Sequence, residues 1–232
     1  MTSIKAVAVD IDGTITDDKR RLCVSAMNVL RKVEKLGIPT IIVTGNVANY
    51  AYATEVLIGT SGGIVCENGG GIFKENENNN EVLFFGDITE VEKAHDYVLN
   101  NIDPKYTLMP SSDNNYRSSE RVYYKTLDKE VIADLVKDFN VKVYDSGFAI
   151  HITDPNINKG NALEKLLKWS DIKMSEVMAI GDGENDIEFL EHAGLKIAVG
   201  NADEKLKSIA DYIWENKYGD GVAEAIEKFV FN

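Results

Sequence analysis

Cysteine, proline and positive charge are all scarce in this sequence of 232 residues. It contains 2 cysteines and 4 prolines, and 25 Lys and Arg residues stand against 38 Asp and Glu, giving a net charge of −13. Cys23 and Cys66 form neither a Cys-x-x-Cys pair nor part of a histidine cluster, so we expect no disulfide framework and no zinc site. Nucleic-acid phosphates are bound by clustered Lys and Arg, and we therefore expect no nucleic-acid partner.

Long apolar runs are also missing. The longest uncharged stretch, residues 37–54, is interrupted by Pro39 and Gly45, which does not fit a membrane-spanning helix. The first residues lack the basic start and apolar run of a signal peptide, because Asp10 follows almost at once. We expect a cytoplasmic protein with no membrane partner.

What the sequence does contain is the composition of a globular protein. Hydrophobic residues make up 44% and charged residues 27%, a balance that allows a sizeable buried core. At about 150 residues per domain, the length corresponds to one domain and a smaller second unit.

Apolar strands alternate with amphipathic helices at both ends of the chain. The strands are expected at residues 4–9, 40–43, 177–180 and 197–199. Between the first two, Ser25 can cap a helix whose apolar residues recur every three or four positions and which Gly37 ends. This alternation is typical of a parallel sheet covered by helices on both faces, so the fold class is α/β with a Rossmann-like core.

The middle of the chain follows another pattern. A polar run at 74–81 is followed by aromatic and β-branched segments that are separated by hairpin-length gaps. These segments lie at 121–125, 141–144 and 149–153. They predict an antiparallel sheet with helices on one side. We therefore expect a core domain formed by residues 1–83 and 155–232, with a smaller α+β domain inserted at 84–154.

Four aspartates follow two of the expected strands. Asp10 and Asp12 come at the end of the first strand, and side chains two apart on a strand point the same way. Asp182 and Asp186 follow strand 177–180 and are about one helical turn apart. If the two loops adjoin, the four carboxylates converge at one edge of the sheet, where they would repel each other unless a cation is bound. Oxygen ligands of this kind favour Mg²⁺ over zinc.

The tetrapeptide Asp-Ile-Asp-Gly at 10–13 has other interpretations, of which a solvated turn is one. A calcium-binding EF-hand loop is excluded, because it needs Gly at its sixth position and Glu at its twelfth, where this sequence has Ile15 and Arg21. The sequence also lacks the Gly-x-x-x-x-Gly-Lys-Ser/Thr loop of many nucleotide hydrolases.

Two further positions fit phosphate binding. Thr44 lies between a strand and an expected helix start, where its hydroxyl and free backbone N–H groups can bind phosphate oxygens, although a Thr-Gly pair also fits a simple turn. Lys159 opens a helix, where its charge opposes the helix dipole. An anion beside Lys159 would explain that position, and a solvated surface lysine is the alternative.

In chain order these residues resemble the four motifs of the haloacid dehalogenase (HAD) superfamily of phosphatases. The motifs are Asp-Ile-Asp-Gly-Thr at 10–14, Thr-Gly at 44–45, Lys159, and Gly-Asp-Gly-x-Asn-Asp at 181–186. The insertion lies where the type II caps of that superfamily lie. Glu-Asn-Gly-Gly at 67–70 looks like the signature of its type IIB, or Cof-type, branch.

Within that branch, the length, the small insertion and Thr-Gly-Asn at 44–46 resemble most closely the archaeal-type phosphoglycolate phosphatases. Many relatives carry Arg where Asn46 stands, a difference that bears on the substrate and not on the chemistry. The resemblance implies Mg²⁺-dependent hydrolysis of a small phosphomonoester, with 2-phosphoglycolate as the first candidate, through an aspartyl-phosphate intermediate.

The resemblance also implies a role for each motif residue. Asp10 is the nucleophile, and Asp12 is the general acid and base. Mg²⁺ is bound by Asp10, the backbone carbonyl of Asp12, and Asp182, with Asp186 in or near the first coordination sphere. The phosphoryl group is bound by Thr44, Gly45, Asn46 and Lys159, and Asn185 supports the site.

Substrate choice is expected to reside in the inserted domain. Its loop at 114–119 holds Arg117 among small polar residues. We hypothesise that Arg117 binds the distal carboxylate or hydroxyls of the substrate through its planar guanidinium, against the alternative of a surface arginine without a role. The expected partner is a small phosphorylated metabolite, and the sequence is compatible with a homodimer.

Other functions share parts of this pattern. A sugar phosphatase, or a phosphotransferase such as a phosphomutase, would use the same nucleophile. An aspartyl-phosphate receiver also combines carboxylates, Mg²⁺ and Lys, but the length and Asp12 argue against it, because a signalling phosphate must persist and Asp12 would hasten its loss. A catalytically silent binding protein is disfavoured because no motif residue is missing.

Overall fold

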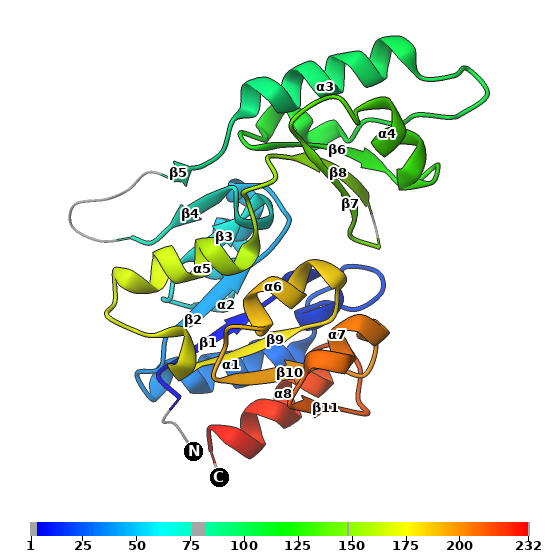
Figure 1. Ribbon diagram of the computed structural model, residues 1–232. Helices are drawn as coiled ribbons and strands as arrows, with labels where there is room; N and C mark the ends of the chain where they lie inside the picture. Colours follow the sequence, from blue (N-terminus) through cyan, green and yellow to red (C-terminus); the bar gives the residue numbers. More distant parts are fainter. Residues whose placement is uncertain (1–3, 76–81, 148, 232) are drawn as a thin grey trace. The chain divides into compact units, whose positions relative to one another are not determined.

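The computed structural model describes residues 4–75, 82–147 and 149–231 (Figure 1). Most of the polar run expected at 74–81, namely residues 76–81, lies outside the described residues. The chain divides into two compact units, one formed by residues 1–83 and 158–232 and the other by 84–157. We call them the core unit and the inserted unit.

One sheet forms the centre of the core unit. Within the described residues it has 8 strands in the order β11-β10-β9-β1-β2-β3-β4-β5. They are β1 (Ala6–Val9), β2 (Thr40–Val43), β3 (Ile64–Cys66), β4 (Gly71–Phe73), β5 (Leu83–Phe84), β9 (Val177–Gly181), β10 (Leu195–Ala198) and β11 (Tyr212–Ile213). Neighbours from β11 to β3 pair in parallel, whereas β4 pairs antiparallel with β3. Because β1 lies between β9 and β2, the loops that follow these three strands meet at one edge.

Helices cover both faces of this sheet (Figure 1). They are α1 (Val24–Lys35), α2 (Ala48–Ile58), α5 (Lys159–Lys168), α6 (Ile187–Leu190), α7 (Glu204–Ile209) and α8 (Tyr218–Phe229). Val7 and Val9 of β1 share an apolar cluster with Val29 of α1 and Val222 of α8. Helices α5 and α6 pack against each other and contact β3, β4 and β9. All four residues of β1 are buried, as expected for a strand covered on both sides, and the predicted α/β class is confirmed.

Helix α1 begins at Val24, so the expectation that Ser25 caps it is wrong. The residue at the N-cap is Cys23, whose backbone N–H donates to the carbonyl of Ile15 at 2.9 Å and so fixes where the helix starts. The prediction that Gly37 ends this helix is confirmed at its C-terminus, because Gly37 adopts a φ of 77° just beyond the last turn. No helix in the described ranges is long and apolar enough to cross a membrane.

The inserted unit has an antiparallel sheet in the order β6-β8-β7. Its elements are β6 (Glu120–Tyr124), β7 (Lys142–Asp145), β8 (Ala149–Thr153), α3 (Ile88–Asn101) and α4 (Lys129–Leu135). One apolar cluster joins both helices to the sheet. It contains Val91, Ala94, Val98, Tyr123, Ile132, Ile150 and Ile152. The predicted antiparallel sheet with helices packed on it is confirmed.

The inserted unit ends at Ile157, whereas the sequence suggested residue 154. The residues after β8 turn back toward the start of this unit. The backbone N–H of Asp87 donates to Oδ2 of Asp154 at 2.8 Å, and the side chain of Ile157 lies against Gly86. These contacts tie residues 154–157 to the inserted unit.

Glu55 of α2 is a buried carboxylate away from the acidic loops. Its Oε1 accepts a hydrogen bond from the backbone N–H of Gly63 at 3.1 Å. Burial raises the pKa of Glu55 from 4.5 to about 7, and the charge of Glu34 adds to the rise. A carboxyl group whose pKa is raised by folding stabilises the protein in its protonated form, and this contribution is lost as the pH rises through about 7.

We predict that Glu55→Gln removes the loss of stability that the ionisation of Glu55 causes as the pH rises. Gln keeps an oxygen acceptor for Gly63 and carries no charge, so the variant should exceed the parent in free energy of unfolding by about 1–3 kcal/mol at pH 8 and by much less at pH 5. Urea unfolding at both pH values measures the difference. The control is Glu164→Gln, whose side chain is 58% exposed on α5. An equal gain in the two variants would contradict the prediction.

Candidate active site

The two acidic loops adjoin at the carboxyl edge of the core sheet. Asp10 follows β1 and is 5% exposed, and its N–H donates to the carbonyl of Ile180 in β9 at 3.1 Å. Thr14 Oγ1 donates to Asp182 Oδ1 at 2.8 Å. Gly13 lies between the loops with a φ of 83°, and a Cβ there would be 2.2 Å from Oδ2 of Asp182. Glycine is therefore required for the loops to approach this closely.

Lys159, the first residue of α5, joins these two loops. Its fully buried Nζ donates to Asp10 Oδ1 at 2.7 Å and to Asp186 Oδ1 at 2.6 Å. Oδ2 of Asp186 accepts from the backbone N–H of Asp182 at 2.9 Å. Burial lowers the pKa of Lys159, but Asp10 and Asp186 raise it more, so the pKa lies above its ordinary value and the ammonium stays charged. The alternative of a solvated surface lysine is wrong.

Three carboxylates gather around this ammonium. Oxygens of Asp10, Asp182 and Asp186 lie within 4.8 Å of one another and could hold a metal ion. Burial raises the pKa of Asp10, Lys159 opposes that rise, and Asp186 and Asp182 add to it. Burial, together with Asp186, raises the pKa of Asp182 to about 7. One ammonium does not offset three carboxylates, and a cation held by their oxygens would favour the ionised forms.

The carboxylate of Asp12 is bound by two side chains. Arg20 donates from Nε to Oδ1 at 2.7 Å and from Nη2 to Oδ2 at 3.4 Å. Asn46 donates from Nδ2 to the same Oδ2 at 2.6 Å and to Thr44 Oγ1 at 3.0 Å. Nη2 of Arg20 also donates to Oδ1 of Asn46 at 2.9 Å. The structure thus joins Asn46 directly to Asp12, and Thr44 to Asp12 through Asn46; the sequence singles out both residues for phosphate binding.

The loop after β3 completes this edge of the sheet. Asn68 lies against Gly45, where a Cβ would be 2.8 Å from the Asn68 side chain. Nδ2 of Asn185 donates to Oδ1 of Asn68 at 3.0 Å. Gly69 has a φ of 100°, and a Cβ there would be 2.1 Å from the carbonyl oxygen of Asn158, just before Lys159. Asn185 is therefore connected to the Thr-Gly motif through Asn68.

The sequence patterns assign no task to three residues of this edge, Arg20, Asn68 and Asn201, although Asn68 lies within the signature at 67–70. Nδ2 of Asn201 donates to the carbonyl of Gly13 at 2.8 Å and to Oδ2 of Asp182 at 3.1 Å. The position of Asn201 just after strand β10 is a signal that could have identified it, because that loop reaches the same edge. For Arg20 the only signal is its closeness in sequence to Asp12.

Arg117 lies in the inserted unit. Its side chain is 4% exposed and forms ion pairs with Glu120 and with Asp113, the latter at 2.8 Å. Glu120 is fully buried and also lies 2.9 Å from Nδ1 of His151. Arg117 is thus part of a buried charged cluster, and the alternative of an exposed surface arginine is wrong. Binding of the substrate by Arg117 stays a prediction.

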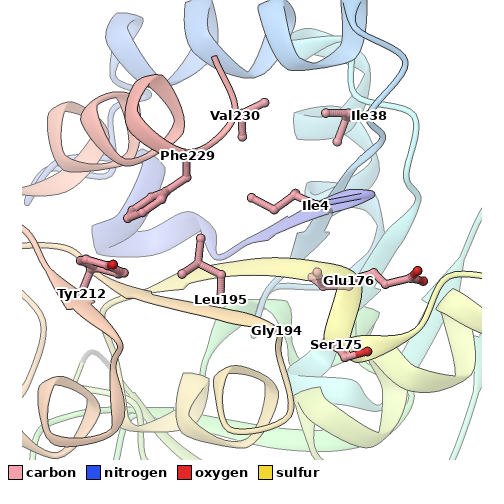
Figure 2. A pocket seen from close by; sticks show the side chains of 10 residues that line it. Ile4, Ile38, Ser175, Glu176, Gly194, Leu195, Tyr212, Phe229 and Val230 are labelled. Carbon is pink, nitrogen blue, oxygen red and sulfur yellow. The ribbon is translucent and has the colours of Figure 1, made fainter. Parts of the chain in front are cut away.

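The amino edge of the core sheet has a cavity of about 580 Å³ (Figure 2). Its apolar lining includes Ile4, Ile38, Leu195, Tyr212, Phe229 and Val230. The charged side chain in this lining is Glu176, which is paired with Lys5 at 2.7 Å. A carboxylate among apolar groups does not fit phosphate binding. The carboxyl edge, with its cations and carboxylates, is therefore the candidate active site.

The chain belongs to the haloacid dehalogenase-like hydrolases, because the model of that family matches residues 7–131 and 119–226. More particular matches include two phosphoglycolate phosphatases. The one from Methanobrevibacter smithii is 54% identical over 232 residues, covering 98% of this chain and 99% of the relative. The one from Methanothermobacter thermautotrophicus is 48% identical over 227 residues, with coverage of 98% and 99%.

Solved structures share the fold. A protein of Thermoplasma acidophilum superposes with a TM-score of 0.86 at 23% identity and covers 98% of both chains. A HAD subclass IIB sugar phosphatase superposes with a TM-score of 0.76 at 20% identity, over 97% of this chain and 98% of the other. The resemblance to the HAD superfamily is confirmed, and the fold is like that of its subclass IIB.

We predict that Asp10→Asn stabilises the protein when a chelator is present. Removing one of three clustered carboxylates reduces their repulsion, and Lys159 keeps Asp186 as a partner. At pH 8 the expected gain is about 1–2 kcal/mol, or roughly 2–8 °C in Tm for a chain of this size. Thermal unfolding in chelator and in Mg²⁺ measures it, and Mg²⁺ should stabilise the parent more than the variant.

Asp18→Asn is the matched control for this measurement, because Asp18 is an exposed carboxylate of the same unit. We expect this change to leave Tm unaltered in both conditions. A lower Tm for Asp10→Asn in chelator would mean that the Lys159 ion pair outweighs the repulsion and would contradict the prediction.

Proposed function

We propose that this protein hydrolyses 2-phosphoglycolate to glycolate and phosphate in the cytoplasm, with Mg²⁺ as cofactor. The observation that carries the proposal is the buried ammonium of Lys159, 2.7 Å from Asp10 and 2.6 Å from Asp186. Such a site combines a nucleophile, a positive charge for a phosphoryl group and oxygen ligands for a cation. Support for the substrate comes from the full-length relatives, which are phosphoglycolate phosphatases.

The reaction has two steps. In the first, a carboxylate oxygen of Asp10 attacks phosphorus, the P–O bond to glycolate breaks, and Asp12 gives its proton to the departing oxygen. In the second, Asp12 takes a proton from water, whose oxygen attacks the aspartyl-phosphate, releasing inorganic phosphate and restoring Asp10. Arg20 and Asn46 hold both oxygens of Asp12, so its carboxylate has one orientation for both proton transfers.

The transferring phosphoryl group is bound by residues of the loop after β2 and of α5. The hydroxyl of Thr44, the backbone of Gly45, the amide of Asn46 and the ammonium of Lys159 contact its oxygens in this proposal. Asn185 supports this arrangement through its hydrogen bond of 3.0 Å to Asn68, which lies against Gly45. Lys159 also offsets the negative charge that Asp10 brings to an anionic substrate.

Mg²⁺ would be held by Asp10, Asp182 and Asp186 together with the backbone carbonyl of Asp12. These donors fit the ion, because all are oxygens and the carboxylate oxygens lie within 4.8 Å of one another. The raised pKa values of Asp10 and Asp182 point the same way, since they reflect negative charge that the protein itself leaves unbalanced. Bound Mg²⁺ supplies positive charge that offsets the phosphoryl oxygens and the nucleophile.

The two parts of the chain have different tasks in this proposal. The core unit carries out the chemistry, and the inserted unit, predicted from the sequence at 84–154, acts as the cap that selects the substrate. Arg117 binds the distal carboxylate or hydroxyls of the substrate from the inserted unit. Its buried position among Glu120 and Asp113 holds the guanidinium in one orientation.

We predict rapid phosphate release from 2-phosphoglycolate that requires Mg²⁺ and is lost with chelator. Asp10→Asn should lower kcat by about 10³-fold or more, because the attacking oxygen is replaced by an amide. Release of inorganic phosphate from a substrate panel measures this, with Asp18→Asn as the active control. The panel includes several sugar phosphates, and a free sugar as phosphoryl acceptor.

Each alternative function gives its own result in this assay. If phosphate is released faster from sugar phosphates than from 2-phosphoglycolate, the proposed chemistry stands and the proposed substrate is wrong. Phosphate moved to the sugar in place of water would identify a phosphotransferase. If nothing is hydrolysed and a stable aspartyl-phosphate accumulates, the receiver is the better description and the proposal is wrong.

For the inserted unit we predict that Arg117→Ala raises the KM for 2-phosphoglycolate by about tenfold or more, through loss of a charge-assisted hydrogen bond. The control is Arg121→Ala, which removes a guanidinium paired with Glu92 at 2.7 Å in the same unit. Because Arg117 is buried, circular dichroism must show that the variant is folded. An unchanged KM for every good substrate would refute a binding role for Arg117.

A further inference from the structure

A short loop after the first motif returns Arg20 to the carboxyl edge of the core sheet. Thr16 and Leu22 form an antiparallel bridge that closes the loop. Arg20 has a φ of 59°, in the left-handed region. Oδ1 of Asp17 accepts from the backbone N–H of Arg21 at 3.0 Å. The backbone of this loop is therefore ordered by its own hydrogen bonds, and it places the Arg20 side chain beside Asp12.

The guanidinium of Arg20 is only partly used by these contacts. Three of its hydrogen bonds, two to Asp12 and one to Asn46, come from Nε and Nη2. Nη1 makes none of these three bonds, and the side chain is 52% exposed. Tyr50 is a further partner of Arg20, through a side-chain hydrogen bond and with its ring centre 5.6 Å from the guanidinium carbon. A guanidinium held along one side in this way can still bind a second carboxylate with its other donors.

The other cation at this edge is placed differently. Lys159 is fully buried, and both of its hydrogen bonds go to carboxylates of the protein. Arg20 carries its charge at the solvent-facing side of Asp12, where a substrate can reach it. Lys159, whose Nζ lies 2.7 Å from the proposed nucleophile Asp10, suits the phosphoryl group, and Arg20 suits a second anionic group on the same substrate.

The chemistry of 2-phosphoglycolate determines where that second group lies. In the proposed reaction Asp12 protonates the ester oxygen, so this oxygen must come within hydrogen-bonding distance of the Asp12 carboxylate. Only one carbon atom separates the ester oxygen from the substrate's carboxylate. A cation hydrogen-bonded to Asp12 is therefore next to the position of that carboxylate, whatever the orientation of the remaining atoms.

From this geometry we infer that Arg20 binds one oxygen of the substrate's carboxylate, in addition to the contact proposed for Arg117, and selects phosphomonoesters of α-hydroxy acids, an inference that rests on the proposed function. Asn46 holds the other oxygen of Asp12 at 2.6 Å and keeps the acid–base carboxylate oriented while Arg20 binds substrate. Arg20 then connects recognition of the leaving group to proton transfer, because its side chain contacts both the substrate's carboxylate and Asp12.

The test compares 2-phosphoglycolate with 2-hydroxyethyl phosphate, which has a hydroxymethyl group in place of the carboxylate. We measure kcat/KM of both compounds for the parent, Arg20→Ala and Arg21→Ala. Ala keeps the Cβ of Arg20, so the change makes no new demand on the backbone. Arg21 is the matched control, because its guanidinium binds Asp17 at 2.8 Å in the same loop.

We expect the parent to prefer 2-phosphoglycolate and Arg20→Ala to reduce that preference by about tenfold or more. Arg20→Ala should also lower kcat/KM somewhat for both compounds, because Asp12 loses a hydrogen bond. Arg21→Ala should keep the parent's ratio of the two kcat/KM values. If Arg20→Ala lowers kcat/KM by the same factor for both compounds, Arg20 acts only through Asp12. The inference is then wrong, although the proposed function stands. If the parent hydrolyses neither compound but is active on another phosphomonoester, the proposed function fails, and the inference fails with it.

Discussion

The buried ammonium of Lys159 is the interaction on which the whole catalytic edge depends. Moving a charged group out of water costs roughly several kcal/mol in a protein, so such a group persists only with well-placed partners. Lys159 has two, at 2.7 Å and 2.6 Å, on loops that follow different strands of the core sheet. The ion pair therefore holds those loops together, and it also positions Asp10 and Asp186. The same ion pair therefore stabilises the fold at this edge and arranges the residues proposed for catalysis.

Glycines allow the backbone to come close enough for this arrangement. Gly13 leaves space for the carboxylate of Asp182, and Gly45 leaves space for Asn68. With no side chain in the way, polar groups of neighbouring loops reach each other directly, as Thr14 and Asp182 do at 2.8 Å. Groups fixed in this way need little rearrangement when charge develops on a substrate, which is how preorganised sites stabilise transition states.

Much of the fold was predictable, because strand and helix periodicity is local. The parallel core, the antiparallel insertion and the meeting of two acidic loops all follow from such patterns. What could not be predicted depends on contacts that periodicity does not encode. Arg20 reaches Asp12 from a loop in which its own backbone is left-handed, and the buried Arg117 is paired with two carboxylates. Asn201 binds Gly13 from a loop 188 residues away in sequence.

The position of the insertion has an evolutionary consequence. It joins the core unit after residue 83 and ends at residue 157, two positions before Lys159. The carboxylates and the ammonium all belong to the core unit, so lengthening, shortening or exchanging the segment between these junctions need not move any of them. Descendants of such a chain can change what they accept while inheriting the same reaction, and diversity in this fold can grow by replacing one continuous stretch of the gene.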